Sequence, residues 1–362
     1  MKRNFVKIIL IMSAVYFVIP GARLPESVIN SRLSSLDASV FNRLTAGAQP
    51  IDHQTLVHDS VLEGAVHVFW LWRVIAKASG MPQTAAFEWE ADGGPSMAAE
   101  TWRLHAYTKV GDLLEDVEET LTESERDAMH DQVHALVQPF GFFLQQWVGR
   151  WYLTRKDDWR VAVRPWCAQK HRALTSASIA GEDAQNFLKL QQTLAQFLAE
   201  HPVNQARQAA GQAPIQGFWP DGGSRRYLLK PSTLRAVMAN DSYVHGWAQN
   251  AGLLNFRTTR VNDEWPEAPQ GDLLCVIDDL YDAYRQGNWD LWFERWPQAW
   301  EKIQNLAHQA QQRRCQHVVL ISTGETDTHT CTAELKGKAG GFFARFSKPK
   351  SADLSTFLAE HV

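Results

Sequence analysis

The chain has 362 residues, of which 45% are hydrophobic and 21% are charged. A chain of this length and apolar content can bury a substantial core in one large or two medium domains, which excludes disordered, collagen-like and small disulfide-stabilised proteins. Lysine and arginine number 36 and aspartate and glutamate 40, so the net charge is −4. This balance argues against nucleic acid as a general partner.

The four cysteines, Cys167, Cys275, Cys315 and Cys331, are too few and too widely spaced to form a dense disulfide framework. Reduced thiols are therefore expected, and with them a cytoplasmic location.

The N-terminus allows two interpretations. Residues 1–19 combine a basic start with an apolar run, which is typical of a secretory signal cleaved after Ala22. Against cleavage there, a proline stands where a small residue is required, and the run is too short for a stable membrane span. We favour a buried strand over Val15–Ile19, with residues 1–14 as a dispensable extension; export or membrane tethering is the alternative.

Apolar spacing and turn residues predict the first half of the chain in order: a helix over 36–44, a long helix over 55–77, a surface connection over 83–96 and a strand over 101–114. Thr122 and Glu125 form a capping-box pattern that starts a helix reaching Val137. A hairpin over 140–153 and a strand over 160–164 follow.

The second half begins with an amphipathic helix over 182–200, a short helix over 203–210 and a turn over 215–223. Strands are then predicted over 272–277, 317–322, 328–335 and 342–346, and helices over 278–287, over 289–313 and from 351. This alternation predicts an α/β fold with a mainly parallel sheet covered by helices. Residues 15–362 would form one unit, with 96–165 as an inserted, smaller α+β subdomain.

Tryptophan is unusually frequent, with 15 copies. Trp289, Trp292, Trp296 and Trp300 recur at intervals of three and four, which places them on one face of a helix and predicts core packing. Trp219 is the one copy that we expect beside a site.

Two motifs carry a resemblance to a known family. His201-Pro-Val-Asn204 with Arg207 precedes Phe218-Trp-Pro-Asp-Gly-Gly223. This combination resembles the bacterial phosphoglycerate-mutase-like, Rpf-type regulatory proteins, over nearly the whole chain from Val15. Its tryptophan-glycine turn is also similar to one in the archaeal type of cofactor-independent phosphoglycerate mutase. The resemblance implies the α/β fold of the alkaline-phosphatase-like superfamily.

The chain departs from these proteins at the metal-binding positions and in the turn. The phosphoglycerate mutases hold two divalent ions with aspartates and histidines at strand ends, and neighbouring residues cannot replace a lost ligand. Here the first strand ends in Ile19-Pro20-Gly21, and Ser322-Thr-Gly-Glu325 stands where an Asp-His-Gly motif is expected. The family turn also departs, with Gln216 for Asn, Asp221 for Trp and Ser224 for Gly. An intact two-metal site is therefore not implied.

Asp278 and Asp279 are the candidate metal ligands, because carboxylates at the carboxyl edge of a parallel sheet point into the usual active-site crevice. The alternative is that they cap the following helix. Asp327 and His329 could join the site, although their threonine-rich segment is also typical of a solvated edge strand.

Gly222-Gly-Ser-Arg-Arg226 has the composition of an anion-binding loop, with glycines that let backbone amides converge and two guanidinium groups for phosphate. The alternative is an exposed loop with solvated arginines. The candidate ligand-binding residues are Arg207, Trp219, Asp221, Gly222, Gly223, Ser224, Arg225 and Arg226.

These observations predict a catalytically degenerate phosphoglycerate-mutase-like protein that binds a phosphorylated small molecule or acts as a regulator, with no cofactor. The alternative is an active metal-dependent phosphomutase or phosphatase with a rearranged site, which would need Mn²⁺ or Mg²⁺.

Overall fold

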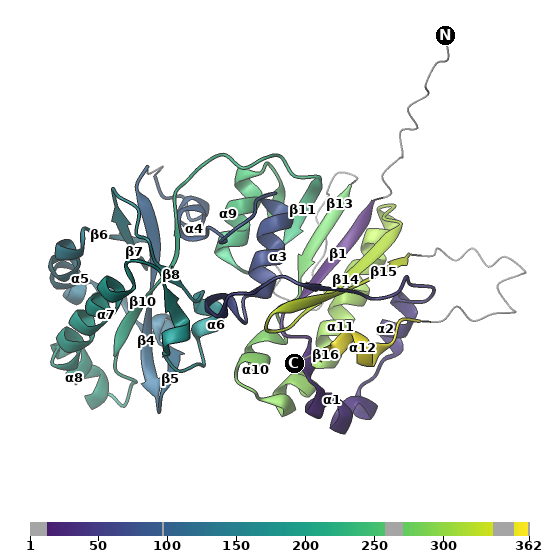
Figure 1. The fold of residues 1–362 in the computed structure, drawn as a ribbon, viewed down its shortest axis with the longest axis horizontal. Helices are drawn as coiled ribbons and strands as arrows, with labels where there is room; N and C mark the ends of the chain where they lie inside the picture. The colour runs from purple at the N-terminus through teal and green to yellow at the C-terminus, as the bar shows by residue number, and fades with distance from the viewer. Residues whose placement is uncertain (1–12, 96–97, 258–270, 336–350, 361–362) are drawn as a thin grey trace, which may run out of the picture.

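The computed structural model describes residues 13–95, 98–257, 271–335 and 351–360, which form two lobes (Figure 1). The first lobe is built on a mainly parallel sheet and the second on an antiparallel one. Residues 1–12 of the predicted N-terminal extension and the strand predicted over 342–346 lie outside the described residues.

The described part of the first lobe has a seven-stranded sheet in the order β12-β11-β13-β1-β14-β15-β3. The first five strands of this order are parallel, and β15 and β3 are antiparallel to their neighbours. Their bounds are β1 Ala14–Ile19, β3 Asp52–Thr55, β11 Leu234–Met238, β12 Leu254–Phe256, β13 Asp272–Val276, β14 His317–Thr323 and β15 Asp327–Glu334. The strand predicted at Val15–Ile19 is confirmed as the middle strand.

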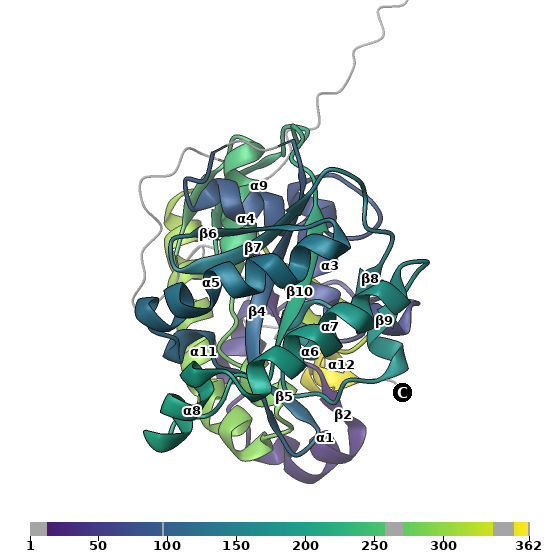
Figure 2. The same ribbon diagram turned by 90° about the vertical axis from the view of Figure 1, so that its left-hand side faces the viewer.

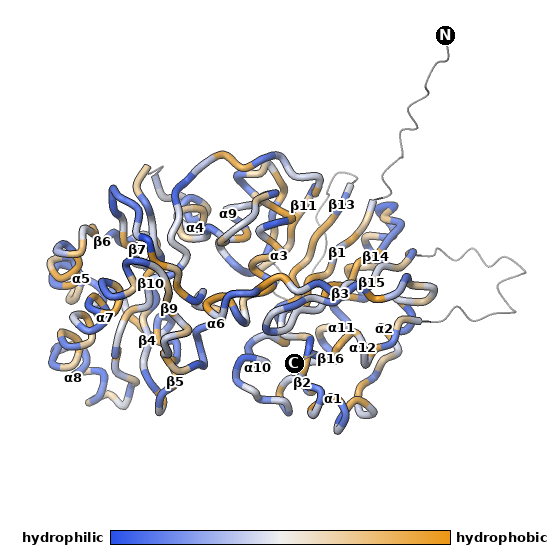
Figure 3. The backbone as a smooth tube through the Cα atoms, viewed as in Figure 1, coloured by the Kyte–Doolittle hydropathy of each residue, from blue (hydrophilic) through white to orange (hydrophobic). Residues whose placement is uncertain are grey.

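Helices cover both faces of this sheet because the central strands are apolar on both sides. Val15 and Phe17 of β1 pack in the core that contains α11 (Trp289–Gln312), whereas Val18 packs with α3 (Val66–Ile75) and α9 (Ser242–Asn250). Figure 3 shows hydrophobic colouring along these strands. The predicted α/β class with a mainly parallel, helix-covered sheet is confirmed.

The tryptophan stripe of α11 forms much of the core on its face of the sheet. Trp292, Trp296 and Trp300 are at most 2% exposed, and successive ring centroids lie 5.2 and 5.0 Å apart. Trp289 packs against this core while partly exposed. The predicted packing role of the stripe is confirmed.

The second lobe is an antiparallel sheet in the order β10-β4-β7-β6, with β5 paired to β4. Its strands are β4 Glu100–Val110, β5 Leu113–Asp116, β6 Phe143–Trp147, β7 Arg150–Arg155 and β10 Gly217–Ser224, and its helices are α5 Glu123–Val137, α7 Ala184–Ala199 and α8 Pro202–Ala209. Figure 2 views this lobe from its outer side, where α5 and α7 cross the sheet. The sheet extends past the predicted 96–165 because β10 pairs along β4.

Shorter elements connect and close the two lobes. They are β2 Leu24–Pro25, α1 Glu26–Arg32, α2 Ser39–Leu44, α4 Ala85–Ala91, β8 Ala162–Val163, α6 Trp166–Gln169, β9 Ile179–Ala180, α10 Tyr281–Arg285, α12 Leu354–Leu358 and β16 Ala359–Glu360. None of the described helices is both long and apolar enough to span a bilayer.

Four local predictions were wrong. The long helix over 55–77 begins only at Val66, after a left-handed turn at Gly64, and residues 52–55 form β3. The connection over 83–96 contains the buried helix α4. The turn over 215–223 is mostly the strand β10. The threonine-rich segment that contains Asp327 and His329 is strand β15, and it is not an edge strand, because it lies between β14 and β3.

The capping box at the start of α5 is confirmed. The Thr122 hydroxyl accepts a hydrogen bond from the Glu125 amide at 3.2 Å, and Glu125 accepts one from the Thr122 amide at 2.8 Å. Thr122→Ala should therefore lower the free energy of unfolding by about 1 kcal/mol in a urea titration. Thr193→Ala, within α7, is the control; an equal loss there would contradict a capping effect.

Candidate ligand-binding site

A cavity of about 350 Å³ lies where the two lobes meet. The second lobe lines it from β4, β10 and α6, and the first lobe lines it from the segment after β11 and the start of α9. Its main polar and aromatic walls are Glu88, Glu100, Trp102, His105, Trp159, Trp166, Cys167, Asp221, Asn240, Asp241 and Tyr243. This size falls within the range of small-molecule sites.

The first-lobe wall follows the carboxyl end of β11, which is the edge where α/β sheets usually bind ligands. Asn240 follows this strand, and its side-chain nitrogen donates to both oxygens of Asp278 at 3.2 and 3.0 Å. Asp278 itself follows β13, the neighbouring strand. It does not cap α10, whose N-cap is Leu280, so that alternative for Asp278 is excluded.

The two candidate metal ligands point to different partners. Asp279 forms an ion pair with the buried Lys302 of α11, at 3.1 and 2.9 Å. Asp278 instead lies near Asp241: burial, and then the charge of Asp278, raise the pKa of Asp241 to about 7. Asp278 therefore interacts with two carboxyl groups at this edge, since the charge of Asp279 also raises the pKa of Asp278, after burial.

The residues at the sheet edge do not fit a two-metal centre. Asp279 is paired with Lys302, and Asp278 accepts hydrogen bonds from the side-chain amide of Asn240. Glu325, which stands where a metal-binding motif would be expected, is held by Arg172 and by Arg285, the latter at 3.0 Å. A pair of metal ions would need carboxylate donors that are already engaged in these ion pairs.

Asp327 and His329 belong to a separate cluster with His53 on β3 and β15. His53 Nε2 lies 2.6 Å from Asp327, and the Arg23 guanidinium contacts the same carboxylate. Burial and then Arg23 lower the pKa of His329 to about 4. Since β15 is three strands from β13, roughly 14 Å at ordinary strand spacing, these residues do not join Asp278.

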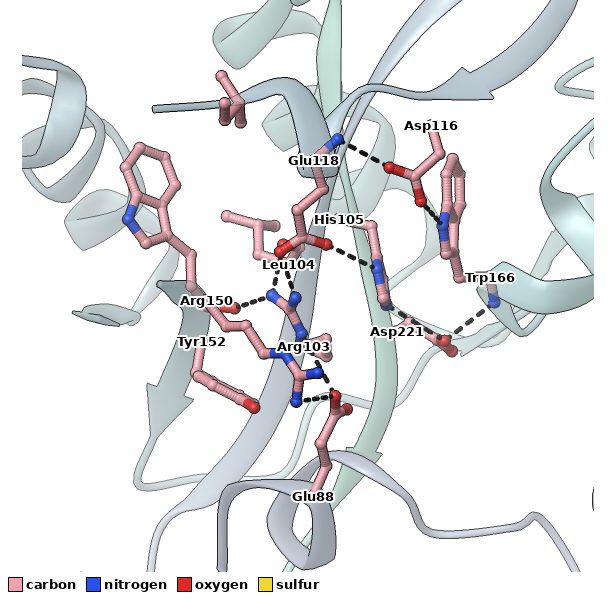
Figure 4. Close-up of polar contacts among 12 residues, drawn as sticks. Glu88, Arg103, Leu104, His105, Asp116, Glu118, Arg150, Tyr152, Trp166 and Asp221 are labelled. Carbon is pink, nitrogen blue, oxygen red and sulfur yellow. Dashed lines mark hydrogen bonds and ion pairs between the residues drawn. The ribbon is translucent and has the colours of Figure 1, made fainter. Parts of the chain in front are cut away.

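Two ionisable side chains of the second-lobe wall, His105 and Asp221, form a row with Glu118, shown in Figure 4. The two ring nitrogens of His105 lie 3.4 Å from Glu118 and 3.7 Å from Asp221. Asp221 also accepts the backbone N–H of Trp166 at 2.9 Å, and the Trp166 ring is stacked on His105. Burial raises the pKa of Asp221, while His105 opposes this shift.

A buried guanidinium fixes this row from behind the cavity. Arg103 forms an ion pair with Glu118 and lies 3.7 Å from Glu88. Burial by itself would raise the pKa of Glu118, but Arg103 and His105 lower it to about 2. Glu118 is therefore a fixed negative charge under His105.

Two glycines let β10 approach its neighbours closely. Gly222 has a φ of +64°, and a Cβ there would lie 1.7 Å from the Thr84 hydroxyl. A Cβ on Gly223 would lie 2.1 Å from the Trp102 ring. The Ser224 hydroxyl accepts the Ala86 amide at 2.8 Å. These residues join β10 to α4 and to the cavity wall.

The predicted ligand-binding arginines lie away from the cavity lining. Arg225 bonds Asp158, and Arg226 makes a two-point contact with Glu90. Arg207 is buried against Glu125 and the loop before α5. Trp219 is wholly buried, with its indole N–H bonded to the Arg164 carbonyl. Among the predicted residues, the structure brings together at the cavity Asp221, Gly222 and Gly223.

No protein-family model and no curated protein matches the chain. Solved structures that are similar over most of their length include the following two. One is the cofactor-independent phosphoglycerate mutase from Thermoplasma acidophilum (14% identity, 97% of this chain and 96% of that one, TM-score 0.42). The other is the PH0037 protein from Pyrococcus horikoshii (11% identity, 95% and 92%, TM-score 0.47). At these scores the similarity is distant and decides nothing about function.

Sequence patterns did not single out His105, Trp166 or Asp241. A signal existed for Asp241, because Asn240-Asp241 follows the apolar run Leu234–Met238 just as Asp278 follows β13. No such signal existed for His105, which lies within a β-strand and meets Asp221 only through the pairing of β4 with β10.

Proposed function

We propose that this chain is a non-catalytic, phosphoglycerate-mutase-like protein that binds a small molecule between its lobes and acts as a regulator. The observation that carries the proposal is the interlobe cavity, whose walls come from both lobes at the carboxyl edge of a parallel sheet. A ligand in this position contacts both lobes and can favour one relative arrangement of them over others. A partner protein that binds one arrangement better would then respond to the ligand.

We propose that the protein is not a catalyst because its candidate nucleophile is protonated and two of its candidate metal-binding carboxylates are paired with cationic side chains. Burial, with the charges of Asp221 and Asp241, raises the pKa of the Cys167 thiol to about 12, so it is protonated and a poor nucleophile. Asp279 and Glu325 are occupied by cationic side chains.

A metal-dependent phosphatase or phosphomutase is the second candidate. The closeness of Asp241 and Asp278 favours it, because two neighbouring carboxyl groups with raised pKa values gain from a cation between them. Under this alternative, Mn²⁺ or Mg²⁺ would bind stoichiometrically and turnover would disappear in Asp278→Ala.

We expect the purified protein to carry an equimolar small molecule in native mass spectrometry and to lose it in Ala162→Phe, because Ala162 lines the cavity. Ala180→Phe is the matched control, since Ala180 pairs with Ala162 across β8 and β9 but does not line the cavity. Mutase and phosphatase assays with added Mn²⁺ should show no turnover. Metal-dependent turnover that is lost in Asp278→Ala would overturn the proposal in favour of the second candidate.

A further inference from the structure

Acidic side chains dominate the ionisable groups in the walls of the interlobe cavity. Four carboxyl groups line it, those of Glu88, Glu100, Asp221 and Asp241, and no lysine or arginine does among the described residues. Glu88 is balanced from behind by Arg103 and Arg150. Burial raises the pKa of all four carboxyl groups, which therefore gain from a nearby cation and disfavour a bare phosphate group.

Asp241 is a carboxyl group of the cavity that would gain from a neighbouring cation. It has no ion-pair partner in the described part of the chain, and the charge of Asp278 acts on it. Burial is the first cause that raises its pKa, and the charge of Asp278 is the second. A positively charged group placed here would relieve both the desolvation and the repulsion.

Aromatic rings make up much of the remaining wall. Trp102, Trp159, Trp166 and Tyr243 line the cavity. Trp102 and Trp159 meet edge to face at 5.0 Å, and His105 stacks on Trp166 at 5.4 Å, so these rings are held in place. Fixed aromatic rings beside carboxylates bind organic cations well, because the faces of the rings attract positive charge while their carbon surface replaces water.

We propose that the ligand of the interlobe cavity is a compact organic cation, an amine or quaternary ammonium compound. This inference rests on the proposed function and names the ligand class. A cavity of about 350 Å³ is far larger than a bare metal ion needs and accommodates a molecule of this kind.

The test is isothermal titration calorimetry of the full chain with choline and with its neutral isostere, 3,3-dimethylbutan-1-ol. The two probes have the same shape and hydroxyl group and differ in charge. We expect choline to bind at least tenfold more tightly. Inorganic phosphate and 3-phosphoglycerate, titrated without metal, should bind more weakly than choline.

Asp241→Asn should weaken choline binding at least tenfold. The Asp241 side chain makes no capping hydrogen bond to α9, and its removal relieves a buried charge, so this variant should be at least as stable as the wild type. Asp131→Asn is the matched control, because its side chain is fully exposed on α5; it should bind choline as the wild type does.

The outcomes separate this inference from the proposed function. Equal affinity for choline and its neutral isostere, or binding of 3-phosphoglycerate alone, would overturn the cation preference while keeping a ligand in the cavity. Choline binding that is unaffected by Asp241→Asn would also overturn it. Loss of the co-purified molecule in both Ala162→Phe and Ala180→Phe would instead count against the proposed function itself.

Discussion

Replacing Trp296 by alanine is expected to lower the free energy of unfolding by about 3–5 kcal/mol, the range for large aromatic truncations in a packed core. Trp296 is 1% exposed between Trp292 and Trp300, and its indole N–H donates to the Asp37 carbonyl at 3.3 Å. Truncation leaves a void and removes the donor from that carbonyl. Urea denaturation followed by circular dichroism measures the change.

Trp289→Ala is the matched control, because Trp289 lies on the same face of α11 at its exposed beginning. It should cost well under half as much, since part of its surface is already in water. If both substitutions cost the same, the tryptophan stripe would not be packed as the structure shows.

The parts of the fold that could be predicted from sequence are those whose residues determine their conformation locally. The repeat of tryptophans along α11 fixes a buried face by helical geometry alone. The exchange of hydrogen bonds between Thr122 and Glu125 needs only four consecutive residues. Strand β1 is apolar on both faces, and such a strand is stable only where helices cover both sides of the sheet. Its composition therefore predicts an interior position.

The parts that could not be predicted depend on partners distant in sequence. Residues 217–224 contain three glycines and a proline, which locally favour a turn, yet they form a strand because β4 supplies the hydrogen bonds. The short helix α4 has acidic and glycine-rich surroundings, and it is stabilised by the burial of Phe87 and Trp89 against other elements. In both cases tertiary contacts outweigh local preference.

The same distinction applies to the candidate site. Asp278 could be placed at the carboxyl edge of the sheet because it ends a recognisable strand. Its partners could not be identified, because Asn240 and Asp241 follow another strand, and the partner of the neighbouring Asp279, Lys302, comes from the middle of α11. Arg225 and Arg226 suggested an anion site by composition, but nearby carboxylates hold them.

Replacing Arg103 by methionine is expected to lower the free energy of unfolding by about 3–5 kcal/mol at pH 7. Arg103 is 3% exposed and is the main positive charge beside Glu118; it also donates to the Leu104 and Trp151 carbonyls at 3.1 Å. Methionine fills a similar volume but leaves Glu118 buried with only His105 beside it. Arg150→Met is the control, because Arg150 is partly exposed and shares Glu88 with Arg103; it should cost less.

The pH dependence identifies the charge as the cause. The pKa of Glu118 is lowered to about 2 in the folded protein from an ordinary 4.5, so the stability it contributes is complete above about pH 4.5 and is lost as the pH falls toward 2. The difference between wild type and Arg103→Met should therefore be greatest above pH 4.5 and shrink below it. Adding Glu118→Gln to Arg103→Met should recover much of the loss at pH 7, because it removes the uncompensated charge. A loss that is independent of pH and not reduced in the double variant would show that Arg103 acts through packing rather than through its ion pair.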